Sequence, residues 1–370
     1  MHANKIAAIH QSPLRLVLAI AGGASRAISE LLNVTGASAT VLEAIVPYHQ
    51  AALSEYLGST PESFASVDCA RKMAMVAYQR GNRYVEFPHE ATGIGVSASL
   101  ASDRPKKGLH RLHVAIQTKD LSHTYSIEFC KDKRDRAEEE CLSTQLLLEI
   151  IYSLACGSSL KVPELMPGEA ISEESHRAST PMTMLLAKEL NYLVMPGYHQ
   201  CSNLVFPGAF NPFHNGHRAM VQYAESLLNR KVTLEIAIAN VDKPPIDFIE
   251  MNRRYSAING EYPMVFSNMP TFEEKALHLP ATTFIIGFDT IQRIIEPRYY
   301  GNSESKMKRA LETIRECGSR FLVFGRVGNT GFSTLADIEL PVALKEICIE
   351  VAETEFRSDL SSSEMRGRDK

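Results

Sequence analysis

Short apolar runs alternate with stretches of helical spacing along most of this 370-residue chain. An apolar run bounded by polar and turn residues is typical of a strand, whereas apolar residues three and four apart are typical of a helix. In the first part of the chain this pattern predicts strands at 14–21, 40–47, 94–100, 112–118 and 124–130, the last two joined as a hairpin. It predicts helices at 25–32, 61–80 and 133–156.

The same alternation returns after a segment of different character. Residues 157–180 are rich in Ser, Pro and Gly and poor in large apolar residues, which predicts a linker, and a helix is expected at 181–194. Beyond it the pattern predicts a helix at 248–258 and strands at 203–206, 232–239, 282–286, 320–324 and 347–351. We therefore expect a first domain at 1–156, a linker and helix at 157–200, and a second domain at 201–370.

Strands separated by helices favour an α/β fold, in which a parallel sheet carries helices on both faces. Ligands of such sheets bind beyond the carboxyl ends of the strands. In the second domain four segments lie at such ends: the loop after 203–206, the loop after 232–239, the stretch 287–290 and the region after 351. These are the places where functional residues are expected.

Composition narrows the class of protein. Hydrophobic content of 45%, charged content of 22% and a net charge of −4 are ordinary for a globular protein and do not favour nucleic-acid binding. None of the seven cysteines forms a CxxC pair, so we expect reduced thiols in a cytoplasmic protein and no zinc site. The run LRLVLAIA at 14–21 resembles a signal peptide, but it continues into Gly22-Gly23 and a helical pattern, so a buried strand is predicted. No run is long enough to span a bilayer, and no membrane partner is expected.

The strongest chemical signal is the stretch GAFNPFHNGH at 208–217, which lies between a predicted strand and a predicted helix. A helix N-terminus offers free N–H groups and a partial positive charge to an anion. Gly208 and Gly216 allow close approach of the backbone to a ligand, and His214 and His217 add side-chain donors that can be cationic. The pattern indicates a phosphate site; the alternative is two polar loop histidines.

This stretch resembles the HxGH motif of the nucleotidylyltransferase superfamily, in the form GxFNPxHxGH of its nicotinamide-mononucleotide adenylyltransferase branch. Residues 360–366, LSSSEMR, are similar to that superfamily's ISSTxxR signature. The resemblance implies a Rossmann-like, doubly wound parallel sheet. It also implies transfer of AMP from ATP to nicotinamide or nicotinate mononucleotide, with release of pyrophosphate. Mg²⁺ is expected to arrive with ATP, because no carboxylate cluster stands ready to hold it.

The resemblance also assigns roles to residues. His214 and His217 would donate to the α- and β-phosphates, Ser361 or Ser362 would take the γ-phosphate, and Arg366 would hold the leaving pyrophosphate. Lys243, in the loop after 232–239, is either a further phosphate ligand or a solvated loop lysine. Arg253 or Arg254 could contact phosphate or form a surface salt bridge. The whole ATP-binding set is Gly208, Phe210, Asn211, Gly216, Ser361, Ser362 and Ser363, with His214, His217, Lys243 and Arg366 as catalytic residues.

The stretch GFDT at 287–290 resembles the GxD segment of the same enzymes. Asp289 could accept hydrogen bonds from a ribose or cap a helix. The expected second-substrate residues are Gly287, Asp289, Thr290 and Arg293, and Arg298 is a further candidate for a substrate phosphate. Many of these enzymes stack nicotinamide on tryptophan, which this chain lacks, so Phe288 or Tyr299 is the expected substitute.

The first domain, at about 5–156, resembles the CinA family, whose catalytic members are nicotinamide-mononucleotide deamidases. The stretch VTGASA at 34–39 is similar to the family's PGSSA, which puts Ser38 at its nucleophile, and Tyr48 matches its tyrosine. The family's lysine is Leu53 here, and its ESCTGG segment is replaced by IAGGAS at 20–25. Ser38 is either a remnant nucleophile or a small residue at a tight turn. We therefore expect a degenerate CinA-like α/β domain that binds a nucleotide or mediates dimers.

Three alternatives to the adenylyltransferase stay open. The HxGH motif does not choose the base, so a cytidylyltransferase or another activity of the superfamily fits as well. A bifunctional enzyme with residual deamidase activity is the second, and a non-catalytic nucleotide-binding module is the third. The expected partners are ATP and a mononucleotide, with a homo-oligomer through the N-terminal domain left open.

Overall fold

The computed structural model describes residues 2–87, 89–103, 107–197, 200–239, 244–258, 260–328 and 331–357. The chain divides into two compact units, which are treated separately below. Unit 1 comprises Met1–Thr183 together with Asp242–Glu250, and unit 2 comprises Met184–Val241 together with Met251–Lys370. A short segment of the C-terminal half thus belongs to the N-terminal unit.

Unit 1 is built on a six-stranded mixed sheet with the order β2-β1-β3-β4-β5-β6. Strand β1 pairs in parallel with β2 and β3, and the pairs β3–β4, β4–β5 and β5–β6 are antiparallel. The strands are β1 (Arg15–Ala21), β2 (Val41–Ile45), β3 (Ala91–Ser99), β4 (His110–Gln117), β5 (Leu121–Phe129) and β6 (Ile171–Arg177). The expected hairpin of β4 and β5 is confirmed.

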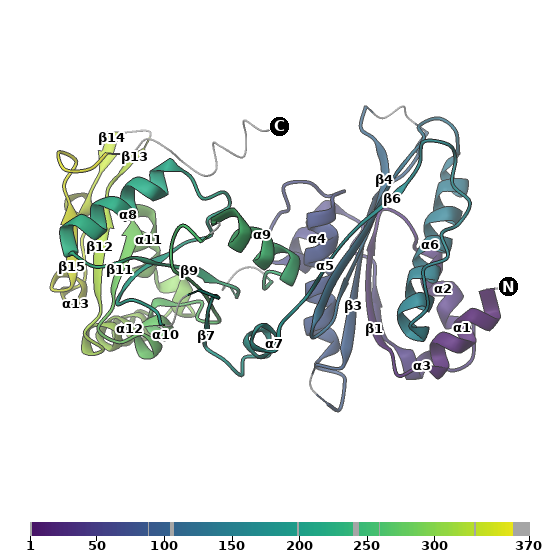
Figure 1. Ribbon diagram of the computed structural model, residues 1–370, viewed down its shortest axis with the longest axis horizontal. Helices are drawn as coiled ribbons and strands as arrows, with labels where there is room; N and C mark the ends of the chain where they lie inside the picture. Colours follow the sequence, from purple (N-terminus) through teal and green to yellow (C-terminus); the bar gives the residue numbers. More distant parts are fainter. Residues whose placement is uncertain are drawn as a thin grey trace. The chain divides into compact units, whose positions relative to one another are not determined.

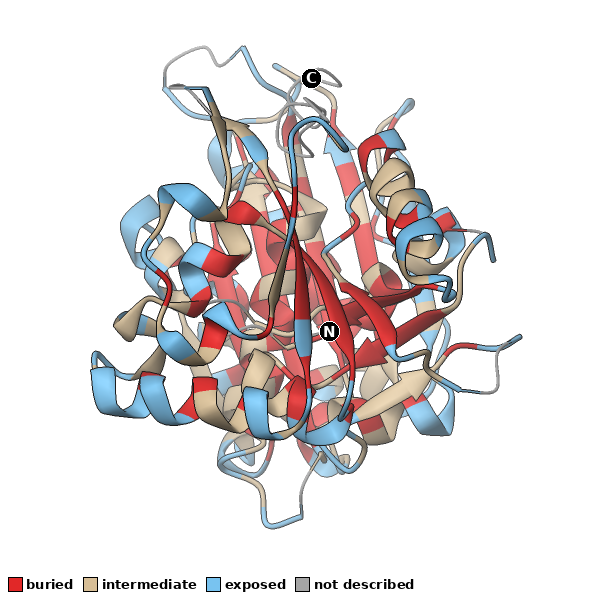
Figure 2. Ribbon diagram, turned by 90° about the vertical axis from the view of Figure 1, so that its left-hand side faces the viewer, coloured by how far each residue is buried: buried red, intermediate tan, exposed pale blue. Residues whose placement is uncertain are grey.

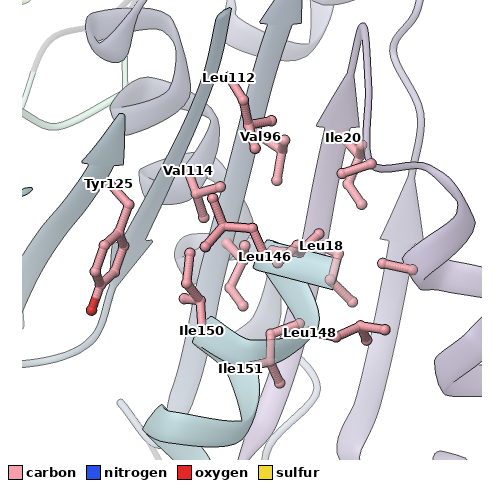
Figure 3. Packing of buried hydrophobic residues seen from close by; sticks show 14 of the residues in the cluster. Leu18, Ile20, Val96, Leu112, Val114, Tyr125, Leu146, Leu148, Ile150 and Ile151 are labelled. Carbon is pink, nitrogen blue, oxygen red and sulfur yellow. The ribbon is translucent and has the colours of Figure 1, made fainter. Parts of the chain in front are cut away.

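Helices cover both faces of this sheet (Figure 1). The helices are α1 (His2–Gln11), α2 (Arg26–Leu32), α3 (Ala37–Thr40), α4 (Gln50–Leu57), α5 (Val67–Gly81) and α6 (Arg136–Cys156). On one face α1, α2 and α6 close a large apolar core, in which Leu146, Ile150 and Ile151 of α6 meet Leu18 and Val96 of the strands (Figure 3). On the other face α4 and α5 pack on β1 and β3.

Helix α5 lies unusually close to β3. A Cβ added to Gly93 would sit 2.1 Å from the carbonyl oxygen of Ala74, and one added to Gly95 would sit 2.1 Å from that of Ala70. Only glycine permits such an approach of helix and strand backbones. The sequence of β3 therefore fixes where α5 lies, and with it the side chains that α5 presents.

Two expectations for this unit differ from the structure. The segment predicted as a linker contains β6, whose residues are mostly exposed and polar, so that it carries none of the apolar alternation of a half-buried strand. The helix expected from residue 61 begins only at Val67, because the side chain of Ser66 caps it by accepting from the N–H of Cys69. The apolar run 14–21 is confirmed as a buried strand, β1.

Unit 2 is built on a seven-stranded sheet with the order β15-β12-β11-β8-β9-β10-β7. All neighbours are parallel except β7, which is antiparallel to β10. The strands are β7 (Tyr192–Val194), β8 (Leu204–Pro207), β9 (Thr233–Ala237), β10 (Met264–Ser267), β11 (Thr283–Gly287), β12 (Arg320–Phe324) and β15 (Cys348–Val351). A separate hairpin is formed by β13 (Arg326–Gly328) and β14 (Gly331–Ser333).

The helices of unit 2 lie between its strands along the chain, apart from α7, which precedes them. They are α7 (Thr180–Leu186), α8 (Asn215–Leu228), α9 (Phe248–Ile258), α10 (Phe272–His278), α11 (Phe288–Ile294), α12 (Glu304–Glu316) and α13 (Val342–Lys345), with the 3₁₀ turns η1 (Pro297–Tyr300) and η2 (Leu335–Asp337). Helix α7 begins in unit 1, and α9 begins in the segment assigned to unit 1. The helix expected at 181–194 is wrong beyond Leu186, because residues 192–194 form β7 and pair with β10. Buried residues run along the strands, whereas the helices carry both buried and exposed positions (Figure 2).

Read from β8 outward, the parallel strands follow the order 3-2-1-4-5-6 of the dinucleotide-binding fold. The expected Rossmann-like, doubly wound sheet is therefore confirmed. Across the described part of the chain no helix combines the length and the apolar character needed to cross a bilayer.

Candidate functional site

The strand order of unit 2 reverses between β8 and β11, which pair directly through Leu204↔Thr283 and Val205↔Phe284. In a doubly wound sheet the crevice beyond the carboxyl ends at such a reversal receives the ligand. The stretch 208–217 follows β8, and Gly287–Thr290 follows β11. Two segments that are about 75 residues apart in sequence thus leave the same edge of the sheet from neighbouring strands.

The loop between β8 and α8 has a tightly defined backbone. The N–H of Gly208 donates to the carbonyl of Glu235 at 2.9 Å, and Phe210 takes the left-handed region with φ of 45°. A Cβ on Gly208 would lie 2.6 Å from the ring of Phe210, so glycine is needed for this packing. From α9, the guanidinium of Arg254 donates to the carbonyl of Ala209 at 3.1 Å. The loop is therefore held from both sides.

The two histidines of the motif lie against each other at the start of α8. Their ring centroids are 3.7 Å apart and their planes are inclined by 21°. The backbone N–H of His214 donates to Nδ1 of His217 at 3.2 Å. Because Nδ1 accepts this bond, the proton of the neutral His217 ring is on Nε2, which makes Nε2 a hydrogen-bond donor.

Aromatic neighbours surround His217. Its ring stacks on Phe213 with centroids 5.5 Å apart and meets the edges of Phe210 at 5.2 Å and Phe206 at 5.9 Å. Burial, helped by His214 and Arg218, lowers the pKa of His217 to about 3. Burial, with Arg218, also lowers the pKa of His214, whose side chain is only 6% exposed. Both imidazoles are therefore neutral near pH 7, whereas the sequence left a cationic state open.

The first turn of α8 carries no acidic residue, so its N–H groups and dipole favour an anion. Gly216 is buried within this turn, while Asn211 of the preceding loop is exposed. Arg218 lies over the ring of Phe213 at 4.8 Å and forms a two-pronged ion pair with Glu261, the shortest contact being 2.8 Å. Arg218 thus supplies positive charge near the imidazoles from a position fixed by Glu261.

The second segment begins at Gly287, which caps α11. Asp289 therefore stands in the first turn of the helix instead of at its cap, and its carboxylate pairs with Arg326 of β13. Thr290 is half-buried beside it, and Arg293 is exposed in the last turn of the helix. The β13–β14 hairpin thus contacts the segment expected to hold the second substrate.

The expected aromatic platform is wrong for Phe288. Its side chain is only 6% exposed and packs in the apolar cluster of unit 2, so it has no face to offer a ligand. Tyr299 is half-buried, and the guanidinium of Arg298 lies 4.8 Å from its ring. Arg298 is itself paired with Glu296. The pattern FDTIQRII could have shown this, since Phe288, Ile291 and Ile294 have the spacing of a helix face.

Five expected site residues lie outside the described residues: Lys243, Ser361, Ser362, Ser363 and Arg366. Their roles stay predictions. Among the last described residues, Phe356 packs against Phe324 at 4.8 Å and Tyr223 at 5.8 Å, and the hydroxyl of Tyr223 donates to Glu355 at 3.0 Å. Glu355 and Phe356 therefore lie against α8, the helix that begins with the histidines.

In unit 1, Ser38 is exposed in the short helix α3, next to Gly36 with φ of 98°. Tyr48 is 68% exposed. Within the described ranges no hydrogen bond or ring contact joins Ser38 to Tyr48. The positive φ at Gly36 fits the interpretation of Ser38 as a small residue near a tight turn.

The turn after β1, where unit 1 would also offer backbone donors to a ligand, is filled by the protein itself. The carboxylate of Glu140 on α6 accepts from the N–H of Ala24 at 2.8 Å and from the N–H of Arg26 at 3.2 Å. Its other contact is the hydroxyl of Ser25 at 3.2 Å. An internal carboxylate thus satisfies the backbone donors at the start of α2.

No three His, Cys, Asp or Glu side chains come together as a metal site in the ranges that the structure describes.

The sequence analysis did not predict a buried ion pair at the base of the histidine loop. Lys275 of α10 contacts Glu235 of β9 at 2.7 Å, and both are nearly inaccessible to solvent. The signal was present, because Glu235 interrupts the apolar run VTLEIAIA.

Comparison with known proteins gave three results. Residues 205–368 match the model of a protein family described as Cytidylyltransferase-like. A search of curated proteins found no match. Solved structures similar to the N-terminal part include the competence/damage inducible protein CihA from Agrobacterium tumefaciens, at 19% identity, covering 41% of this chain and 92% of that chain with a TM-score of 0.34.

Two further similar structures are described as competence-damaged protein (CinA) superfamily proteins. The protein from Escherichia coli is 16% identical, with 42% of this chain and 90% of that chain covered and a TM-score of 0.35. The protein from Klebsiella pneumoniae is 12% identical, with 42% and 96% covered and a TM-score of 0.35.

Proposed function

We propose, from the premise that residues 205–368 form a cytidylyltransferase-like nucleotidyltransferase domain, that this protein transfers AMP from ATP to nicotinamide or nicotinate mononucleotide. In this reaction a phosphate oxygen of the mononucleotide attacks the α-phosphorus of ATP. The bond from that phosphorus to the bridging oxygen breaks, and pyrophosphate leaves. The product is a dinucleotide of the NAD type.

The observation that carries the proposal is the neutral, stacked imidazole pair at the start of α8. Negative charge grows on the bridging and leaving oxygens during phosphoryl transfer, and fixed donors aimed at them lower the barrier. Nε2–H of His217 is such a donor, because Nδ1 is engaged by the N–H of His214. The helix N-terminus adds backbone donors, and Arg218 adds positive charge.

The chain between Phe356 and the C-terminal motif is long enough for the motif to reach the start of α8. Tyr223, against which Phe356 packs, is six residues after His217, or about 9 Å along α8. Ser361 is five residues beyond Phe356, which an extended chain can span with up to roughly 17 Å. We therefore propose that Ser361, Ser362, Ser363 and Arg366 complete the triphosphate site, with Lys243 as a further phosphate ligand.

The second substrate is proposed to bind at Gly287, Asp289, Thr290 and Arg293, beside the reversal of the sheet. A ribose hydroxyl that donates to Asp289 would share that carboxylate with Arg326. Mg²⁺ belongs to the substrate here, because it arrives bound to the phosphates of ATP and neutralises part of their charge. All seven cysteines are free thiols, which supports a cytoplasmic location.

A cytidylyltransferase is the second candidate, because the family match carries that name. The histidine loop contacts phosphates in both cases and does not read the base. Incubation of the full chain with Mg²⁺ and either ATP or CTP, against a panel of mononucleotides, separates the two. Dinucleotide formation from ATP and nicotinamide or nicotinate mononucleotide supports the first proposal. Pyrophosphate release with CTP alone replaces it with the second.

The histidine variant His217→Asn tests the site itself. The asparagine oxygen can accept the N–H of His214 in place of Nδ1, so the start of α8 is preserved, but no donor reaches the position of Nε2. We expect kcat to fall by about 10²–10³-fold with little change in thermal stability. The matched control is His278→Asn, an exposed histidine of α10, which should leave kcat unchanged. A fully active His217→Asn enzyme would refute the assignment of the donor.

A further inference from the structure

A cation lies beside the histidine pair within unit 2. Arg218 follows His217 directly near the N-terminus of α8. Its guanidinium lies over the ring of Phe213 at 4.8 Å, and the same ring stacks on His217 with centroids 5.5 Å apart and planes inclined by 11°. His217 in turn stacks on His214. The guanidinium, the phenyl ring and the two imidazoles thus form one cluster at the start of the helix.

The positive charge of Arg218 reaches both imidazoles. Burial is the largest cause of the lowered pKa of His214 and of His217, and the charge of Arg218 adds to it in both. A charge that disfavours an imidazolium also attracts an anion bound at the same place. An anion held by the imidazoles and the helix N-terminus therefore lies in the field of Arg218.

The direction of this guanidinium is fixed by Glu261, in the segment between α9 and β10. Its carboxylate accepts from Nε of Arg218 at 2.9 Å and from Nη2 at 2.8 Å. The next residue, Tyr262, contacts the ring of Phe213 with centroids 5.5 Å apart. Within the described ranges the side chain of Arg218 makes no hydrogen bond to any other residue. Nη1 and the second N–H of Nη2 are thus left for a ligand.

The ion pair is open to solvent. The side chains of Arg218 and Glu261 are 33% and 40% exposed. An ion pair at such exposure contributes little to the stability of a fold, because water screens it. A phosphate in solution can reach the guanidinium. Loss of the pair should therefore weaken the binding of a ligand more than it weakens the fold.

We propose that Arg218 is a direct ligand of the triphosphate through Nη1 and Nη2, and that Glu261 is the positioning residue that orients it. A guanidinium can contact a carboxylate with one edge and a phosphate with another. A side chain that is already ordered loses less entropy on binding. Glu261 thus strengthens the binding of an anion although it is itself negative. The inference rests on the proposed function of the histidine loop and names two residues that lie outside its HxGH motif.

Inorganic pyrophosphate with Mg²⁺ is the probe, because it offers phosphates without a base or a mononucleotide. Its Kd and that of ATP are measured by calorimetry on the full chain, together with steady-state kinetics. Glu261→Gln keeps one acceptor and loses the charge, Arg218→Lys keeps the charge and loses the fork, and Arg218→Met loses both. Glu312→Gln is the matched control, since Glu312 also accepts from Nε and Nη2 of an exposed arginine, Arg315 of α12.

We expect Arg218→Met to raise the Kd of pyrophosphate and of ATP by about ten- to a hundredfold, because charge-assisted hydrogen bonds are lost. Glu261→Gln should raise both by about three- to tenfold, because the guanidinium must then be ordered on binding. Arg218→Lys should bind no better than Glu261→Gln, since an ammonium lacks the second edge. Glu312→Gln should match the unmodified chain. Hydrogen-exchange protection of the α8 amides in Glu261→Gln should stay within about fivefold of the unmodified chain.

Several results would overturn the inference. An unchanged Kd of pyrophosphate in Arg218→Met excludes the direct contact. A lower or unchanged Kd in Glu261→Gln shows that Glu261 acts as a negative charge alone. Full binding by Arg218→Lys shows that the fork is not needed. A loss of α8 protection larger than the loss of affinity shows that the pair holds the helix instead of the ligand.

The same measurements keep this inference apart from the proposed function. If the unmodified chain binds ATP and pyrophosphate but transfers no AMP, the proposed function fails and the Kd values still decide the roles of Arg218 and Glu261. An unmodified chain that binds neither ligand overturns both.

Discussion

Replacement of Lys275 by methionine should destabilise unit 2 far more than the loss of an ordinary lysine. Lys275 and Glu235 are in contact at 2.7 Å with side chains 4% and 1% exposed. Lys275 also donates to the carbonyl of Met269 at 2.7 Å, and Ser267 donates to the same carboxylate oxygen of Glu235. The second carboxylate oxygen of Glu235 is buried without a hydrogen bond in the structure. Lys275→Met therefore leaves a buried negative charge with a single hydroxyl partner.

The magnitude follows from the burial of both ends. Removal of one member of a buried ion pair costs about 3–5 kcal/mol, because the remaining charge has lost its water and gained nothing in return. The double variant Glu235→Met with Lys275→Met carries no buried charge and should recover more than half of that loss. Lys231→Met is the matched control: its side chain is 83% exposed and pairs with Glu225 at 3.0 Å, so its loss should cost under about 1 kcal/mol.

Hydrogen exchange measures the loss of stability in each unit separately, whereas a single melting temperature of a chain with two units does not. Protection of the β9 amides should fall by about a hundredfold to a few thousandfold in Lys275→Met, while the β1 amides of unit 1 serve as an internal reference. If the protection of the β9 amides falls by less than about tenfold, the reasoning is refuted. A double variant less protected than Lys275→Met would refute it as well.

Two further outcomes are expected in unit 1. Burial, with Arg111, lowers the pKa of His113 to about 4 from its ordinary 6.5, so below pH 6.5 the unfolded chain takes up a proton that the folded chain does not. The contribution of His113 to the free energy of unfolding is therefore complete above pH 6.5 and falls by about 2 kcal/mol at pH 5. Urea unfolding measured between pH 7 and pH 5 should show a flatter pH dependence for His113→Asn than for the unmodified chain. Equal pH dependences of the two proteins would contradict this prediction. Glu140→Ala should lower the hydrogen-exchange protection of the β1 and α2 amides by about ten- to a hundredfold, because two backbone N–H groups lose a charged acceptor. The amides of unit 2 serve as the reference. Unchanged protection would show that water replaces the carboxylate without loss.

Strong local signals were enough to place much of the fold. Helix α9 follows the predicted bounds, and α6 ends at Cys156, before Gly157, which takes the left-handed conformation that stops helices. The apolar runs of unit 2 gave a parallel sheet because each was separated from the next by a helix. The strand β10, with four residues, is too short to show a period, and it was not predicted. The polar edge strand β6 is held by pairing with β5, which no local pattern reveals.

The site divides in the same way. The motif at 208–217 predicted which residues lie at the start of α8, since glycines and a helix N-terminus are local features. Sequence could not predict that burial makes the two imidazoles neutral, because the enclosing rings of Phe206 and Phe213 are set by tertiary packing. Nor could it predict that Asp289 pairs with Arg326. In unit 1, Arg71 of α5 is buried beside Asp247 and Glu250, partners about 180 residues away that no local pattern reveals.

The chain segment assigned to unit 1 from beyond residue 240 limits how this protein can be divided. A single cut near residue 200 would yield an N-terminal fragment in which Arg71 lacks Asp247 and Glu250, and Ser122 lacks the N–H of Phe248. A chimaeric protein that replaces unit 1 therefore has to include residues 244–250 together with the part of unit 1 that they contact.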